Sequence, residues 1–335
     1  MTSAAATRKY YDLIGDIHGC AETLTVLLQK LGYREHRGAY RYLGETASKR
    51  VDQYPVSDQV THQVIFLGDF IDRGPGQRKV VDIVRSMLAQ GSALAVMGNH
   101  EFNAIAYATR DLHGGGYLRA HSRKNTQQHA AFLTAYADAE ERQVVIDWFR
   151  LIPLWLDLGD LRVVHACWER QSMQRILECQ QGSTLLGNDL LLQSCHPGTW
   201  QYGALETLLK GKEIPLPPGV VFHDKENTAR HHIRVRWWDD SAENYRAAFL
   251  GPESARTGIP EDPIQGEHLV EYGHGEPPVF LGHYWFEGTP VPLAGNIACL
   301  DYSVARPGGK LVAYRWQGEQ QLVPEHFCWV PRQEP

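Results

Sequence analysis

Short apolar runs that end in glycine alternate with longer helical patterns along the first hundred positions of the chain. The runs cover Tyr10–Ile14, Val64–Leu67 and Ala93–Met97. Such segments, nearly continuous in apolar residues and bounded by glycine, are typical of strands buried on both faces of a parallel sheet. The segments between them, Ala21–Leu31 and Gln77–Ala89, have the apolar spacing of helices. The order strand, helix, strand, helix, strand predicts a βαβαβ unit within an α/β fold.

Acidic, imidazole and amide side chains follow each of these predicted strands. Asp16 and His18 follow the first, Asp69 the second and Asn99 the third, each beside a glycine. Because open α/β sheets place their sites at the carboxyl ends of parallel strands, we expect these side chains to lie close together. Carboxylate, imidazole and amide groups suit manganese, iron, zinc or magnesium better than a soft ion. The sequence therefore predicts a metal site.

Two later histidines also follow predicted strands. His165 comes after Leu161–Val164, and His283 comes after Val279–Gly282. A single histidine in such a place is more often an ordinary hydrogen-bonded residue than a metal ligand. Five strand ends with candidate ligands in one chain favour a common site, so both histidines are included among the candidate ligands.

Five short motifs occur in the order GDIHG, GDFIDRG, GNHE, HACW and GHYW, from residue 15 to residue 285. They resemble the motifs of the calcineurin-like metallophosphoesterases. The DRG and GNHE elements are similar to those of the phosphoprotein phosphatase branch, which also contains dinucleoside tetraphosphatases. The resemblance implies a four-layer α/β/β/α sandwich with a metal site at one end of its two sheets.

The resemblance also implies two divalent metal ions. By motif position, Asp16 and His18 would bind the first ion, Asp69 would bridge both, and the second would be bound by Asn99, His165 and His283. Manganese is the expected ion, and iron, zinc, nickel or magnesium are alternatives. Many members of the wider family have GHxH in the last motif, whereas here Trp285 stands at the place of the second histidine. The first ion is therefore expected to lack a second imidazole.

The catalytic residues implied by the resemblance are His100 as general acid, Asp72 as the group that orients it, and Arg73 as a phosphate ligand, with Asn99 also beside the substrate. His100 directly follows a candidate ligand, where an imidazole can deliver a proton to a leaving group. The planar fork of an arginine can bind two phosphate oxygens at once. Alternatively, Asp72 and Arg73 pair with each other on the surface before a Gly-Pro turn.

A second phosphate-binding arginine is expected in the segment His231–Asp239, because the related branch uses one from this region. Polar and apolar residues alternate there, so Arg234 and Arg236 would share one face of a strand. Arg236 is the preferred candidate and Arg234 the reserve. Alternatively, both arginines face solvent over paired acids.

Other polar residues near the motifs have weaker signals. Glu101 is interpreted as a first-turn acid of a helix that begins near Phe102. Three histidines are left as ordinary solvated or capping residues: His62, His129 and His196. The glycines at 114 to 116 are expected to form a solvated turn, and the basic residues after them are candidates for reaching distal groups of a substrate: Arg119, His121 and Lys124.

Length and composition fit a single elaborated domain of 335 residues with 43% hydrophobic residues. We expect a core made of residues 9–107 and 151–320, with insertions at 33–62, 108–150 and 200–275 that determine specificity. Late in the chain, Ile297–Tyr302 and Lys310–Trp316 predict a hairpin that completes a second sheet.

Charge and cysteine usage limit the class of protein. A net charge of −6 gives no basic footprint for non-specific nucleic-acid binding. The cysteines are scattered without a CxxC pair, as in a reducing compartment. Neither a signal peptide nor an apolar run long enough for a membrane span is recognised, so we expect a cytoplasmic protein without membrane contact.

The expected function is hydrolysis of a phosphomonoester, as by a protein phosphatase, through in-line attack of a metal-bridging hydroxide. The expected partner is a phosphorylated protein, a small phosphate ester or a nucleotide. A dinucleoside polyphosphate hydrolase is the alternative within enzymes, and a catalytically silent, metal-binding regulatory protein is the alternative from another class. The joint presence of His100, Asp72 and Arg73 argues against the silent alternative.

Overall fold

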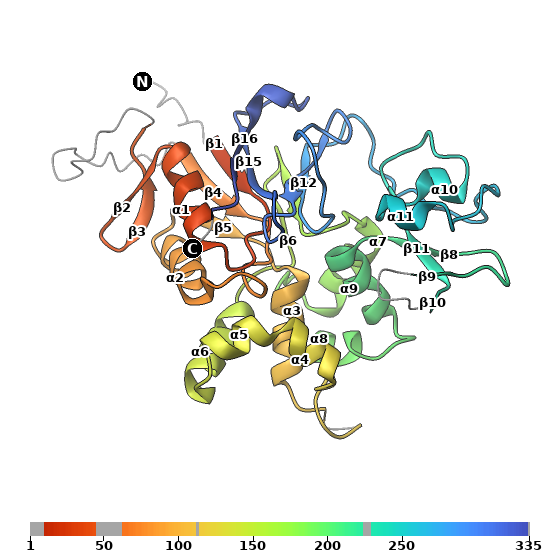
Figure 1. Cartoon of the computed structure of the whole chain (residues 1–335), viewed down its shortest axis with the longest axis horizontal. Helices are drawn as coiled ribbons and strands as arrows, with labels where there is room; N and C mark the ends of the chain where they lie inside the picture. Colours follow the sequence, from red (N-terminus) through yellow and green to blue (C-terminus); the bar gives the residue numbers. More distant parts are fainter. Residues whose placement is uncertain (1–9, 45–61, 112–113, 224–228, 334–335) are drawn as a thin grey trace.

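The computed structural model describes residues 10–44, 62–111, 114–223 and 229–333. Two β-sheets lie at its centre and helices cover their outer faces (Figure 1). This arrangement confirms the predicted four-layer α/β fold. None of the described helices is both long and apolar enough to cross a membrane.

The first sheet combines the predicted parallel strands with antiparallel strands from the end of the chain. Its order is β14 (Asp301–Tyr302), β15 (Lys310–Trp316), β1 (Tyr10–Ile14), β4 (His62–Phe66) and β5 (Ala93–Ala95), with β16 (Phe327–Pro331) paired to β15. β1, β4 and β5 are parallel, as the apolar runs predict. Their carboxyl ends therefore lie along one edge of the sheet.

The second sheet contains β13 (Ile297–Cys299), β12 (Val279–Leu281), β7 (Arg162–Val164) and β6 (Trp155–Asp157) in this order. β12 and β7 are the predicted strands before His283 and His165, and they are parallel to each other. Side chains from both sheets form one cluster between them, with Leu13 and Ile65 from the first and Val163 and Phe280 from the second. Burial on both faces accounts for the nearly continuous apolar runs.

Helices fill the outer layers and the insertions. α1 (Ala21–Lys30) and α2 (Gln77–Ala89) pack on the first sheet, and α3 (Asn99–Ala108) leads from β5 into the first helical insertion. This insertion contains α4 (Arg123–Gln128), α5 (Ala130–Ala135) and α6 (Ala139–Phe149). Beside the second sheet lie α7 (Arg170–Cys179) and α9 (Trp200–Lys210), and α8 (Asn188–Ser194) packs against α9; the sequence predicted none of the three.

A separate small cluster occupies part of the predicted insertion at 200–275. Its elements are β8 (Glu213–Pro215), β9 (Phe222–His223), β10 (Ala229–Arg230), β11 (His232–Arg234), α10 (Tyr245–Ala248) and α11 (Glu253–Arg256). Buried side chains such as Ile214, Ile233 and Phe249 pack with one another there, apart from the two larger clusters. The predicted insertion at 33–62 begins with a hairpin of β2 (Tyr33–His36) and β3 (Ala39–Tyr42), and its remainder, 45–61, lies outside the described residues.

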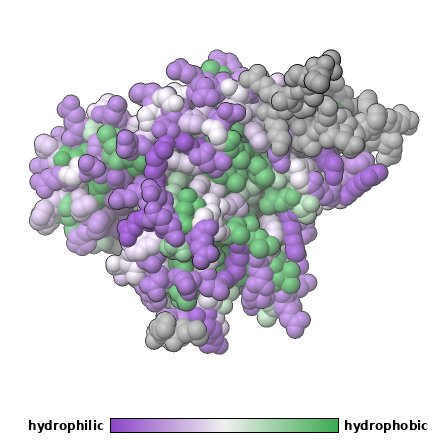
Figure 2. Space-filling model, turned by 180° about the vertical axis from the view of Figure 1, so that it is seen from behind, coloured by the Kyte–Doolittle hydropathy of each residue, from purple (hydrophilic) through white to green (hydrophobic). Residues whose placement is uncertain are grey.

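Behind the view of Figure 1, hydrophobic side chains reach the surface in several groups among hydrophilic ones (Figure 2). The large apolar residues exposed in the described chain are Val26, Val144, Leu151, Leu185, Val221 and Val291. Scattered exposure of this kind is normal for a folded domain.

The prediction that Ile297–Tyr302 is one strand is wrong. Its first half, β13, belongs to the second sheet, and its second half, β14, pairs with β15 in the first sheet. The hairpin of β14 and β15 is therefore confirmed, but it does not complete the second sheet. The chain crosses between the sheets at Leu300, whose carbonyl oxygen would lie 2.1 Å from a Cβ atom at Gly15. The crossing thus depends on a glycine far away in the sequence.

Replacement of Gly15 by alanine is expected to lower the free energy of unfolding by about 1–3 kcal/mol, because the new methyl group meets backbone rather than a flexible side chain. Gly203 is the matched control, since it lies inside α9 and a Cβ atom there meets nothing within 4 Å. Gly203→Ala should stabilise the chain by about 0.5–1 kcal/mol. Thermal unfolding of both variants checks this, and an unchanged midpoint for Gly15→Ala would contradict it.

Candidate active site

The six candidate metal ligands come together where the carboxyl ends of the two sheets meet. His18 Nε2 lies 3.9 Å from Asp16 Oδ2 and 3.7 Å from Asp69 Oδ2. His165 Nε2 lies 3.4 Å from Asp69 Oδ1 and 3.1 Å from the side-chain oxygen of Asn99. The ring of His283 contacts the same oxygen through Nδ1 at 2.7 Å. Strand ends from both sheets therefore supply one cluster.

Asp69 belongs to two overlapping groups of potential ligands. One group contains His18, Asp69 and His100, and the other contains Asp69, His165 and His283; within each group the ligand atoms lie within 4.8 Å of one another. An arrangement with two adjacent groups and one shared carboxylate suits a pair of ions.

Several cluster residues adopt a left-handed backbone conformation that side chains other than glycine rarely occupy. The φ angles are 46° at His18, 52° at Asp69 and 71° at His283. Each such residue costs on the order of 1–3 kcal/mol and persists only where the surroundings hold it. Here the His18 nitrogen donates to the Asp69 carbonyl at 2.8 Å, and the His283 nitrogen donates to Asp16 Oδ2 at 3.1 Å.

Two glycines let the carboxylates approach the backbone closely. A Cβ atom at Gly98 would lie 2.2 Å from Asp69 Oδ1, and one at Gly282 would lie 2.2 Å from Asp16 Oδ1. These short distances explain why the GNHE and GHYW motifs begin with glycine, because any side chain at these positions would displace a candidate ligand.

Glu101 has the predicted role at a helix start and one more. α3 begins at Asn99 rather than near Phe102, and Glu101 supplies one half of a capping box by accepting from the Gly98 nitrogen at 3.0 Å, since the glycine has no side chain for the other half. Its carboxylate also accepts from the backbone nitrogen of Asp69 at 2.8 Å. Glu101 therefore holds the backbone of the shared residue.

The hydrogen bonds of the histidines fit metal ligation. His18 Nδ1 donates to the Ile71 carbonyl at 3.1 Å, and His165 Nδ1 donates to the Leu67 carbonyl at 2.7 Å. Each Nε2 atom then presents a lone pair to the cluster. Among the described residues, Nε2 of His18 and of His283 is buried without a hydrogen-bond partner. Burial lowers the pKa of His18 to about 3, which keeps the ring neutral.

Buried acids in the cluster need positive charge nearby. Burial raises the pKa of Asp16, and the neighbouring carboxyls of Asp301 and Asp69 raise it further. Asp301 was not predicted as a site residue, although it too is buried beside the cluster. Uncompensated acids at such a place repel each other and lose hydration, and divalent ions remove both problems. The residues present therefore fit two divalent cations.

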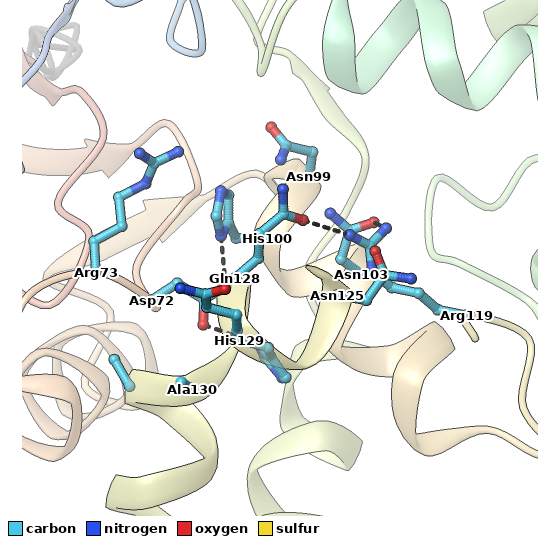
Figure 3. Close-up of a pocket in the computed structure, with 12 residues that line it drawn as sticks. Asp72, Arg73, Asn99, His100, Asn103, Arg119, Asn125, Gln128, His129 and Ala130 are labelled. Carbon is cyan, nitrogen blue, oxygen red and sulfur yellow. Dashed lines mark hydrogen bonds and ion pairs between the residues drawn. The ribbon is translucent and has the colours of Figure 1, made fainter. Parts of the chain in front are cut away.

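Beside the cluster, Asp72 joins two histidines. Its Oδ2 accepts from His100 Nδ1 at 2.5 Å, and its Oδ1 accepts from His129 Nδ1 at 2.8 Å (Figure 3). Burial alone would raise the pKa of Asp72, but the hydrogen bonds from both histidines lower it to about 2. No ion pair links Asp72 to Arg73 in the described chain, so the alternative of a mutual surface pair is wrong.

His129 is a site residue that the sequence analysis missed. It lies between α4 and α5, and the residue is only 5% exposed. The expectation of a capping residue is met, since His129 stands at the cap position of both helices, but its ring is bonded to Asp72 and is not solvated. No spacing relative to a motif marks this histidine, and only the fold brings it to Asp72.

Arg73 is exposed and stacks on an aromatic ring. Its guanidinium carbon lies 3.8 Å from the ring centroid of Trp285, and that of Arg306 lies 4.2 Å from the same indole. Trp285 stands where the wider family has a second histidine, so here this position contacts arginines. Neither Trp285 nor Arg306 was singled out in the sequence as a site residue.

The two candidate arginines of the 231–239 segment differ in their surroundings. β11 ends at Arg234, so Arg236 lies beyond the strand and the expected shared face does not exist. Arg236 is bound by Asp239 at 3.2 Å and by the Ala247 carbonyl at 2.6 Å. Arg234 lies close enough to the cluster for its charge, after burial, to lower the pKa of His283. Arg234 also pairs with an acid, Glu213, at 3.5 Å, so both arginines lie over paired acids, as the stated alternative expects.

Residues 11–244 match the sequence model of the calcineurin-like phosphoesterases. This match covers most of the chain, and the chain belongs to this family. It is thus a metal-dependent phosphoester hydrolase, as its motifs predict.

Several relatives are bis(5'-nucleosyl)-tetraphosphatases by name. The symmetrical enzyme of Methylobacillus flagellatus is 29% identical over 322 residues, covering 93% of this chain and 94% of that protein. The asymmetrical enzyme PrpE of Oceanobacillus iheyensis is 29% identical over 46% of this chain, and PrpE of Bacillus subtilis is 32% identical over 47%. The chain spans about half the length of these two relatives, 54% and 57% respectively.

Solved structures of the same kind are more distant. A protein serine/threonine phosphatase from Saccharomyces cerevisiae is 13% identical, with a TM-score of 0.48, over 99% of this chain and 82% of that one. A cold-active protein-tyrosine phosphatase from a Shewanella species is 14% identical, with a TM-score of 0.47, over 97% of this chain and 81% of that one.

Asp69→Asn is expected to reduce the metal content of the chain, purified without chelator, well below the roughly two ions expected for the unaltered chain. The amide removes negative charge shared by both groups of ligands. Asp157→Asn is the control, since Asp157 lies on β6 and pairs with Arg162. Elemental analysis measures the result, and equal metal content in Asp69→Asn and the unaltered chain would contradict the assignment.

His129→Ala is expected to lower kcat roughly tenfold to a hundredfold while leaving the metal content unchanged, because Asp72 loses one of the two groups that fix it. His196→Ala, in the turn between α8 and α9, is the matched control and should retain full activity. Steady-state kinetics at saturating substrate would test this. If His129→Ala kept the kcat of the unaltered chain, His129 would have no part in positioning Asp72.

Proposed function

We propose that the chain hydrolyses a dinucleoside polyphosphate at the cluster centred on Asp69. Two divalent ions would be held there by Asp16, His18, Asp69, Asn99, His165 and His283. Two adjacent divalent ions supply a water of lowered pKa and neutralise negative charge on phosphate oxygens. The chain's other residues then bind the phosphate and handle the proton of the leaving group.

The observation that carries the proposed chemistry is the position of His100. Its Nδ1 is occupied by Asp72, so Nε2 points back to the cluster and lies 3.9 Å from Asp69 Oδ2. A proton on Nε2 is thus directed at the place where the leaving oxygen would lie. As water oxygen bonds to phosphorus and the bond to the leaving oxygen breaks, that oxygen takes the proton from His100.

Arginines at the rim would hold the phosphate. Arg73 is exposed, faces the cluster and forms no ion pair with a carboxylate of the described chain. Its fork can therefore bind two oxygens of an incoming phosphate. Arg234 is the proposed second ligand, because its Nε is buried without a hydrogen-bond partner among the described residues and its pair with Glu213, at 3.5 Å, is longer than that of Arg236 with Asp239, at 3.2 Å.

The choice of substrate rests on two observations. The relative from Methylobacillus flagellatus aligns over 93% of this chain, and its name is that of a symmetrical bis(5'-nucleosyl)-tetraphosphatase. A cavity of about 730 Å³ also lies beside His100 and Arg73. This volume is in the range of small-molecule sites and leaves room beyond the phosphate at the cluster. Both observations support a substrate with groups on either side of the cleaved bond.

A phosphomonoester, as cleaved by protein phosphatases, is the second candidate. It is favoured by the exposure of Arg73, which would let a phosphorylated side chain of a protein reach the cluster from solvent. The manganese ion expected from the sequence is common to both candidates, as nothing in the ligand set separates it from iron, zinc or nickel.

His100→Asn is expected to lower kcat roughly a hundredfold or more, because the amide retains a hydrogen bond to Asp72 but cannot donate a proton to the leaving oxygen. Metal content, measured on the same sample, should remain that of the unaltered chain. The test is kcat with manganese supplied. A variant as fast as the unaltered chain would remove His100 from the role of general acid.

A substrate panel separates the two candidates. With manganese supplied, kcat/KM is expected to be highest for diadenosine tetraphosphate and lower for p-nitrophenyl phosphate, bis-p-nitrophenyl phosphate and a phosphoserine peptide. The physical reason is that only the first substrate fills the cavity beside His100. A higher value for the phosphopeptide would overturn the proposed substrate and establish the second candidate.

A further inference from the structure

The cavity beside the cluster has two unlike sides. On one side it is lined by Asp72, Arg73, Asn99 and His100, and on the other by residues of the first helical insertion and of α3: Asn103, Arg119, Asn125, Gln127, Gln128 and His129 (Figure 3). The second side consists mainly of carboxamides and one guanidinium. Apart from His129, which bonds to Asp72, its polar groups lie outside the proposed reaction centre, and the proposed chemistry gives them no role.

Arg119 is held in place by neutral groups, and no carboxylate of the residues that the structure describes is bonded to it. Its Nη1 donates to Asn103 Oδ1 at 2.9 Å and its Nη2 donates to Gln128 Oε1 at 3.0 Å. Its backbone nitrogen donates to the Ala106 carbonyl of α3 at 3.0 Å, which fixes the start of the side chain. The half-buried charge of Arg119 is therefore orientated by neutral groups and not cancelled by any acid bonded to it.

The two carboxamides that hold Arg119 keep their own donors. Because Asn103 and Gln128 use their oxygens to accept from the guanidinium, their NH₂ groups remain to donate to another acceptor. Both residues line the cavity. Among the described residues that line the cavity, the one carboxylate is that of Asp72, which is occupied by His100 and His129. A positive charge and uncharged donors without a competing acid suit a ligand that only accepts hydrogen bonds and is negatively charged.

We infer that this side of the cavity binds a second phosphoryl group of the substrate, the one next to the phosphate cleaved at the cluster, with Arg119 as its ligand. The inference rests on the proposed function and names what distinguishes the substrate: a chain of linked phosphates rather than a single ester. Figure 3 shows Arg73 and Arg119 on opposite sides of His100. Two adjacent phosphates can thus bind to different arginines, and the remaining volume accepts a nucleoside.

Arg119→Ala is expected to lower kcat/KM for diadenosine tetraphosphate roughly tenfold to a hundredfold, because a charge-assisted hydrogen bond to phosphate is lost. For p-nitrophenyl phosphate, which has no second phosphate, the change should stay within about threefold. Arg110→Ala is the matched control, since Arg110 stacks on Tyr117 in the same insertion and does not line the cavity. It should match the unaltered chain on both substrates.

A second variant tests the inference independently, in case Arg119→Ala loses activity because it does not fold. Asn103→Asp has almost the same shape, but it places a carboxylate at the atom that accepts from Arg119 and so cancels its charge. It should show the same selective loss as Arg119→Ala. Equal losses on both substrates, or an unchanged rate on diadenosine tetraphosphate in both variants, would overturn the inference.

Calorimetric binding separates this inference from the proposed function. With manganese supplied, Arg119→Ala is expected to bind adenosine diphosphate at least about tenfold more weakly and inorganic phosphate within about threefold of the unaltered chain. If the unaltered chain bound adenosine diphosphate through Arg119 but did not cleave diadenosine tetraphosphate, the proposed substrate would fall and the subsite would remain. Equal affinity of both proteins for adenosine diphosphate would remove the subsite, whatever the enzyme cleaves.

Discussion

The position of Asp69 is the constraint on which the rest of the site depends. Its carboxylate is common to both groups of ligands, so its backbone must be fixed from more than one direction. The Asp69 carbonyl accepts hydrogen bonds from the nitrogens of Ile17 and His18, and its own nitrogen donates to Glu101. The loops after β1 and β4 and the first turn of α3 are thus joined at one residue. A displacement of any of the three would move ligands of both groups.

Because several acids lie together at the cluster, the groups that hold them and the positions of the cationic side chains determine whether metal ions can bind. Asp16 and Asp301 are held by backbone nitrogens, those of His283 and Trp285 respectively, rather than by cationic side chains. Neutral donors stabilise a carboxylate without cancelling its charge, so the acids still attract divalent ions. The cationic side chains lie further out, with Arg73 against Trp285 and Arg119 between carboxamides. The buried acids would therefore account for the affinity for metal, and the arginines at the rim for the affinity for phosphate.

How much of this could be predicted depends on the range of each interaction. The strand ends, the motif ligands and α2, predicted at its observed bounds, have local signals: an apolar run, a glycine and a ligand. His129 and Asp72 are 57 positions apart, and no periodicity or spacing connects them. The division of Ile297–Tyr302 between two sheets depends on space left by Gly15, which is invisible in the segment itself. Contacts among motif residues, such as that of His100 with Asp72, were predicted through the resemblance, whereas contacts of residues outside the motifs, such as that of His129 with Asp72, were not.

The break between α4 and α5 connects substrate binding with proton transfer. Gln128, the last residue of α4, bonds to Arg119, and the next residue, His129, bonds to Asp72. Two adjacent side chains of one short insertion therefore fix both the second phosphate site and the group that orients His100. In a continuous helix, successive side chains lie about 100° apart around the axis. Gln128 and His129 would then be fixed at that angle and could not be directed independently at Arg119 and Asp72. The cost of the break, which leaves two helices too short to be stable alone, is thus offset by contacts at the active site.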